Sequence, residues 1–150
     1  ILWGDTWSDY EHELLMSSPS YLLGNRAVYD KTRSLSLQEV MKKFPLLNDG
    51  FYGGKGGMQA WHKVANLKYE PSKSSLKITD SYTRRQAVID GQGIALWDEL
   101  VREEIEARKL FYISDIKLEG FGYHIVYKNK SSLSFEEKQF RKWILGQLKN

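Results

Sequence analysis

The stretch TDSYTRRQAVIDGQGIALWDELVREEIEARKLFYI, residues 79–113, contains the alternation of elements that decides the fold. Its first helix starts where Asp80 or Ser81 can act as the cap, and we expect it over about residues 82–90. The glycines of the GQG turn at residues 91–93 end this helix, because glycine readily adopts the left-handed conformation that closes helices.

Short apolar runs on both sides of the helices predict strands. Residues 94–96 predict a buried strand, and residues 76–79 and 109–113 predict two more. Strands are also expected at residues 13–16 and 123–127. A second helix between these strands is expected from an apolar stripe at Leu100, Val101 and Ile105. Helices that alternate with short buried strands predict an α/β fold with a largely parallel or mixed sheet.

Two capping boxes mark further helices. Ser36 and Glu39 have the required spacing, and the helix that they begin ends before Pro45. Ser134 and Glu137 repeat the pattern at the start of the last helix. This last helix carries the strongest apolar stripe in the chain, formed by Phe140, Trp143, Ile144 and Leu148.

The composition is that of an ordinary globular domain, with 150 residues, 41% hydrophobic and 27% charged. Cysteine is absent, which excludes a disulfide scaffold and thiolate metal sites and agrees with a cytoplasmic protein. We expect no membrane partner, since no apolar run approaches the roughly 20 residues of a membrane helix and no signal-peptide pattern opens the chain. The net charge is +3, and the lysines and arginines are spread along the chain. This spread argues against direct DNA binding by these basic residues. Because the chain starts on the apolar run Ile1-Leu2-Trp3, we expect it to be a fragment.

The sequence contains no pattern that is typical of catalysis, a metal site or a cofactor. The three histidines, His12, His62 and His124, are far apart, and Asp9, His12 and Glu13 supply too few hard ligands for a metal. No serine lies in a nucleophile elbow. The run of residues 53–57, GGKGG, lacks the serine or threonine that a phosphate-binding loop needs after its lysine, and is therefore interpreted as a turn.

The turn at residues 79–83 is the local feature that favours a binding site. A helix N-terminus presents free amide groups and a partial positive charge, and the hydroxyls of Ser81 and Thr83 add donors for an anionic ligand. The alternative is that Asp80 or Ser81 only caps the helix.

Residues 79–113, followed by GYHIVY and then FEEKQFRKWILGQL, resemble the effector-binding domain of LysR-type transcription regulators. The match consists of a strand, a helix ending in AVIDGQGIAL, a GYHIVY strand and a closing helix with FRKWIL. Upstream, ILWGDTW, SPSYL and SLQEVMKKFPLLND resemble the glycine-cleavage-activator-like branch of the same family. The glycine-rich FYGGKGG loop departs from the family's usual pattern.

The resemblance implies a two-lobed fold like that of type 2 periplasmic binding proteins, with the first lobe truncated. Residues 1–17 and 119–150 would form the remainder of the first lobe and the crossovers, and residues 18–118 the second lobe. It also implies a small-molecule effector, a homodimer or homotetramer, and contact with DNA only through an upstream winged helix-turn-helix domain that this sequence lacks.

The family's effector contacts carry over to eight positions at the mouth of the cleft. The matching residues are Trp3, Gly4, Trp7, Thr79, Asp80, Ser81, Tyr82 and Tyr123. We therefore expect a ligand-sensing domain that binds a small anionic metabolite between two lobes and needs neither catalysis nor a cofactor. A periplasmic-type solute-binding protein is the alternative, and a small α/β enzyme is a third class for which no converging catalytic residues are visible.

Overall fold

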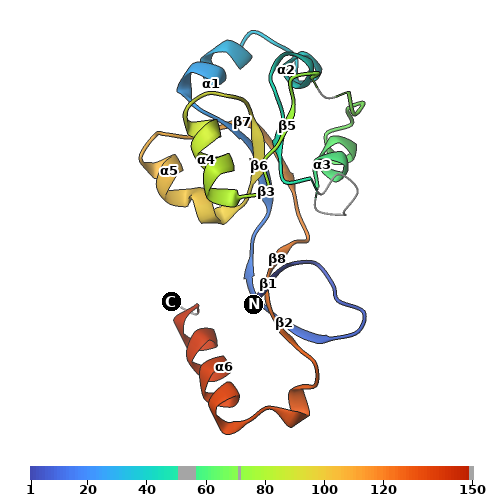
Figure 1. The fold of residues 1–150 in the computed structure, drawn as a ribbon, viewed down its shortest axis with the longest axis vertical. Coiled ribbons are helices and arrows are strands. Elements are labelled where there is room, and N and C mark those ends of the chain that lie inside the picture. The colour runs from blue at the N-terminus through green and yellow to red at the C-terminus, as the bar shows by residue number, and fades with distance from the viewer. Residues whose placement is uncertain (51–56, 71, 149–150) are drawn as a thin grey trace. The chain divides into compact units, whose positions relative to one another are not determined.

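The computed structural model describes residues 1–50, 57–70 and 72–148 of the chain, so most of the glycine-rich loop lies outside the described residues. Clustering of contacts divides the chain into two compact units. One consists of Ile1–Pro19 with Glu119–Asn150, and the other of Ser20–Leu118 (Figure 1). Each unit has its own sheet, and the two are described in turn.

The sheet of the unit Ser20–Leu118 is mixed. Its central strand β3 (Ser20–Gly24) pairs antiparallel with β6 (Ala95–Trp97) and with β7 (Phe111–Leu118). A parallel pair of β4 (Leu47–Asn48) and β5 (Leu76–Lys77) joins it through a parallel bridge between Leu46 and Ile94. The prediction of a mixed sheet is confirmed. The alternative of a largely parallel sheet is wrong, because the central strand β3 is antiparallel to both of its neighbours.

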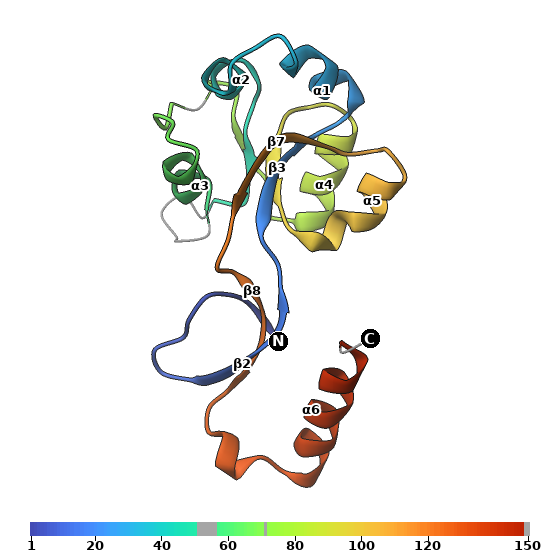
Figure 2. The same cartoon turned by 180° about the vertical axis from the view of Figure 1, so that it is seen from behind.

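Helices flank this sheet, with α4 and α5 on one side and α2 and α3 on the other (Figures 1 and 2). Their bounds are α1 (Arg26–Thr32), α2 (Leu37–Lys43), α3 (Met58–Val64), α4 (Ser81–Ile89) and α5 (Arg102–Glu106), with a 3-10 turn η1 (Glu99–Val101) before α5. The first expected capping box is present, since the Ser36 hydroxyl accepts from the Glu39 amide and the Glu39 carboxylate accepts from the Ser36 amide. The helix expected around Leu100 is instead a 3-10 turn followed by a short α-helix, and the Leu100 side chain is 60% exposed.

The core of this unit lies between the sheet and its helices. Buried apolar side chains from the strands, α4, η1 and the residue before β7 form one cluster, whose members are Leu23, Leu47, Val88, Ala95, Val101 and Leu110. Trp61 on α3 is completely buried, and its Nε1 donates to the carbonyl of Ile116 on β7 at 3.1 Å. Burial of such a side chain contributes about 1.5–3 kcal/mol, so α3 is held by packing as well as by this bond.

One asparagine ties two helix ends together. Asn25 Oδ1 accepts from the amide of Val28 at the start of α1, and its Nδ2 donates to the carbonyl of Ile89 at the end of α4. Gly91 follows α4 with φ +80°, and a Cβ at that position would lie 2.7 Å from Asn25 Nδ2. Glycine there satisfies both the left-handed backbone and the close approach.

The other unit contains a three-stranded antiparallel sheet and the last helix. Strand β8 (Gly122–Tyr127) lies between β1 (Leu2–Gly4) and β2 (Glu11–Ser17). After the 3-10 turn η2 (Lys130–Ser132), helix α6 (Phe135–Gln147) begins with the second expected capping box, at Ser134 and Glu137. The expected apolar stripe of α6 is largely solvent-exposed, with Phe140 49% and Trp143 58% exposed.

Candidate functional site

The turn at the start of α4 is capped by Asp80 rather than by Ser81. Asp80 Oδ1 accepts from the Thr83 amide at 2.7 Å, and hydrogen bonds from the Thr83 hydroxyl and then from this amide lower the pKa of the Asp80 carboxyl. Thr79, Asp80, Ser81 and Tyr82 are all exposed, and Tyr82 keeps 67% of its surface in solvent. The capping interpretation is therefore confirmed for Asp80, and its carboxylate already occupies part of the positive helix terminus.

Two arginines of α4 follow this turn. Arg84 donates to the carbonyl of Ile78 at 2.7 Å and lies over the ring of Trp97 at 4.8 Å. Arg85 pairs with Glu104 on α5 at 3.2 Å and lies near the ring of Tyr82. The turn thus presents exposed hydroxyl groups next to Arg84 and Arg85, whose guanidinium groups are held in place by these contacts.

In the other unit, the four expected residues Trp3, Gly4, Trp7 and Tyr123 divide between the two faces of the sheet. Trp3 and Gly4 lie on β1, with Trp3 opposite Tyr123 in the register with β8. Trp3 stacks on Phe121 with ring centroids 5.0 Å apart. Trp7 packs on Gly4, where a Cβ would lie 2.9 Å from the indole. Trp3 and Tyr123 therefore share one face of the sheet, and Trp7 lies against Gly4 on the other face.

Two histidines that the sequence did not indicate as site residues lie beside Trp7. His12 on β2 and His124 on β8 have ring centroids 5.2 Å apart, and Trp7 contacts both rings. His124 is 7% exposed and its Nδ1 has no hydrogen-bond partner among the described residues. Burial, and then the neighbouring His12, lower the pKa of His124, while Asp5 acts in the opposite direction. Sequence spacing could not reveal the pair, because it forms across two strands that are distant in the chain.

An ion-pair network connects α6 to strand β2. The carboxylate of Glu13 accepts from Arg141 Nε and Nη2, both at 2.7 Å, and from the Tyr127 hydroxyl at 3.0 Å. Lys130 also contacts Glu13. The hydrogen bond with Arg141 is the main reason why the pKa of Glu13 falls from 4.5 to about 2. A carboxylate held ionised by two cations is a structural anchor and a poor general base.

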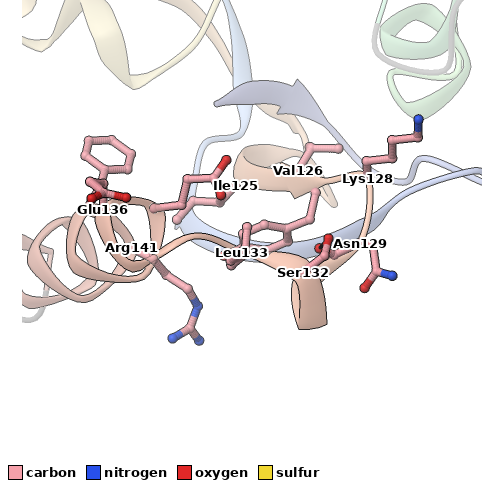
Figure 3. Close-up of a pocket in the computed structure, with 11 residues that line it drawn as sticks. Ile125, Val126, Lys128, Asn129, Ser132, Leu133, Glu136 and Arg141 are labelled. Atoms are coloured by element: carbon pink, nitrogen blue, oxygen red, sulfur yellow. Dashed lines mark hydrogen bonds between the residues drawn. The ribbon is translucent and has the colours of Figure 1, made fainter.

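A pocket of about 510 Å³ lies between β8 and α6 (Figure 3). Its walls include Ile125, Leu133 and Phe140, and Arg141 lines it together with the polar residues Lys128, Asn129, Ser132 and Glu136. Its volume falls in the usual range for small-molecule sites. None of the eight expected contact residues lines it.

Neither a metal-binding cluster nor a membrane-spanning helix is found in the described part of the chain. Within residues 1–50, 57–70 and 72–148, no three His, Cys, Asp or Glu side chains lie close enough to hold a metal ion. The helices formed by those same residues are too short and too polar to cross a membrane.

The fold was compared with known proteins. Neither a protein-family model nor a curated protein matches the sequence. Solved structures do match. The effector domain of the transcriptional regulator AmpR from Pseudomonas aeruginosa is 18% identical with a TM-score of 0.78, and the match covers 97% of this chain and 68% of that one.

Two further structures agree with this match. The AmpR effector-binding domain from Citrobacter freundii is 18% identical with a TM-score of 0.76, over 97% of this chain and 72% of that one. CrgA, a LysR-type transcriptional regulator from Neisseria meningitidis, is 15% identical with a TM-score of 0.74, over 97% of this chain and 50% of that one. The chain therefore has the α/β fold of LysR-type effector-binding domains.

Proposed function

We propose that this chain is the ligand-sensing regulatory domain of a LysR-type DNA-binding transcription regulator. The observation that carries the proposal is the fold match with regulator effector domains over 97% of the chain. Residues 18–118 would form the second lobe, and residues 1–17 with 119–150 the remainder of the first lobe and the crossovers. The domain would act in the cytoplasm within a homodimer or homotetramer, and DNA would be bound by a separate winged helix-turn-helix domain.

The chemistry of the described residues favours a sensor over an enzyme. Glu13 is neutralised by Arg141 and Lys130, so it is not available as a base. His124 lies beside His12 and Trp7, and its Nδ1, the ring nitrogen that a carboxylate orients in a catalytic triad, has no hydrogen-bond partner among the described residues. A solute-binding protein is the competing function for this fold, and the sensor is favoured because the matched structures are those of transcriptional regulators.

We place the ligand's anionic end at the start of α4. The exposed hydroxyl of Ser81 suits a carboxylate, and Arg84 and Arg85 add positive charge that their partners Asp49 and Glu104 partly offset. Because Asp80 caps the same helix, the ligand has to approach beside this carboxylate and cannot replace it. In the other unit, we propose Trp3, Trp7 and Tyr123 as aromatic contacts and Gly4 as a backbone contact.

The test is a thermal-shift screen of the chain against amino acids, small carboxylates and cell-wall fragments. A ligand at a hundred times its Kd stabilises by about 2.7 kcal/mol, which moves the melting temperature by several degrees. Ser81→Trp should abolish the shift, whereas Ser34→Trp, an exposed serine in the same unit, should keep it. No stabilisation by any compound would overturn the sensing function, and a normal response in Ser81→Trp would remove Ser81 from the site.

A further inference from the structure

Three aromatic side chains form a closed cluster on one face of the β1–β8–β2 sheet. The ring centroids of Trp7 and His12 are 5.4 Å apart, those of Trp7 and His124 are 5.0 Å apart, and those of the two histidines are 5.2 Å apart. All three pairs meet edge to face, at interplanar angles of 62–67°. This arrangement suits neutral rings, whose positive edges contact negative faces.

The strand register explains why the histidines meet. Leu14 on β2 is directly opposite His124 on β8, and His12 lies two residues before Leu14 on the same strand. Opposite residues of an antiparallel pair share a face, as do residues two apart on one strand, so the two imidazoles are diagonal neighbours.

Trp7 belongs to the connection between β1 and β2, residues 5–10, and holds that connection on the sheet. Its indole lies against the two histidine rings and on Gly4, where any side chain would collide with it. The hydrogen bonds Thr6 N to Asp5 Oδ1 and Tyr10 N to the Trp7 carbonyl are local to the connection. The ring cluster is therefore one contact that joins the connection to the sheet.

The cluster suits neutral histidines and not charged ones. A charged imidazole donates from both ring nitrogens, but the buried Nδ1 of His124 has no acceptor among the described residues. Of the groups around this ring, β2 contributes His12, which lowers the pKa of His124, and the connection contributes Asp5, which acts in the opposite direction. From β1, the uncharged Leu2 is opposite. The face of Trp7 can attract a cation, but it does not supply the missing acceptor.

We propose that Trp7, His12 and His124 form a proton-sensitive latch that holds the connection at residues 5–10 against the sheet and releases it when His124 becomes charged. Histidine is the side chain whose charge changes between about pH 5 and 8, so the latch would be closed at neutral pH and open in mild acid. The device does not depend on the proposed ligand.

The experiment is NMR spectroscopy of the whole chain between pH 7.5 and 5.0, following nuclear Overhauser contacts from Trp7 to the rings of His12 and His124. These contacts should be strong at pH 7.5 and lost at pH 5.0, because the ratio of open to closed latch rises by up to about tenfold per pH unit. The Trp3–Phe121 stack lies in the same unit and contains no titratable group, so its contacts should persist and exclude unfolding of the unit.

A double variant provides the matched control. His12→Phe with His124→Phe keeps aromatic rings at both positions and removes the protons, so the ring contacts of Trp7 should remain at pH 5.0. Persistent contacts in the wild-type chain at pH 5.0 would overturn the latch, and this result needs no variant to fold. Equal loss of the contacts in the double variant would also overturn it, because the histidines would then not be the cause.

Discussion

The interaction between Glu13 and Arg141 should be a measurable source of stability for the unit that contains α6. Glu13 receives two hydrogen bonds of 2.7 Å from Arg141 and further contacts from Lys130 and Tyr127. Its pKa falls from 4.5 to about 2, and each pKa unit corresponds to about 1.4 kcal/mol, which sets an upper limit of about 3 kcal/mol. The Arg141 side chain is 32% exposed, so solvent screens part of this energy. We expect Glu13→Gln to cost about 1–3 kcal/mol at pH 7.

The pH dependence provides a second measurement of the same interaction. Since folding lowers the pKa of Glu13, its contribution is complete above pH 4.5 and is lost as the pH falls towards about 2. Urea unfolding of the wild-type chain and of Glu13→Gln, with hydrogen exchange in α6 as the local probe, should therefore give free energies that converge in acid. Glu70→Gln is the matched control, because Glu70 also binds two cations, Lys42 and Lys68, but at the surface. Equal stabilities of wild type and Glu13→Gln at pH 7, or a difference that does not shrink in acid, would refute the argument.

Three further results are expected from the packing. Gly93→Ala should destabilise by about 1–3 kcal/mol in urea unfolding, because its Cβ would lie 2.3 Å from the Pro45 carbonyl oxygen, and an unchanged midpoint would contradict this. Gly146→Ala in α6 meets no atom within 4 Å and should stabilise by about 0.5–1 kcal/mol, so any loss of helix content by circular dichroism would argue against it. Burial lowers the pKa of His62, so stability should be complete above pH 6.5 and decrease below it; His62→Gln should flatten that part of the curve of unfolding free energy against pH.

Local elements could be predicted well from the sequence because their signals span only a few residues. The capping boxes at Ser36 and Ser134 are spacing patterns of three residues, and the structure forms both. The strand expected at residues 123–127 is present as β8. The cap of α4 stayed ambiguous in the sequence, because Asp80 and Ser81 both have suitable side chains, and the backbone geometry selects Asp80.

The interactions between distant residues were decided only by the tertiary structure. The Arg141–Glu13 pair joins residues separated by 128 positions, and the His12–His124 contact depends on the register of β2 against β8. A single sequence shows which residues can pair, but strand register also depends on which faces are buried and on the bulge between Leu14 and Met16.

The sequence by itself determined the α/β class, the starts of α2 and α6 and most strand positions, because these follow from spacing and short-range hydrogen bonds. The tertiary structure determined the antiparallel centre of the sheet, the ring cluster around Trp7 and the network around Glu13. These features arise when remote segments pack together, and the free energy of such packing depends on three-dimensional contacts that no local pattern contains.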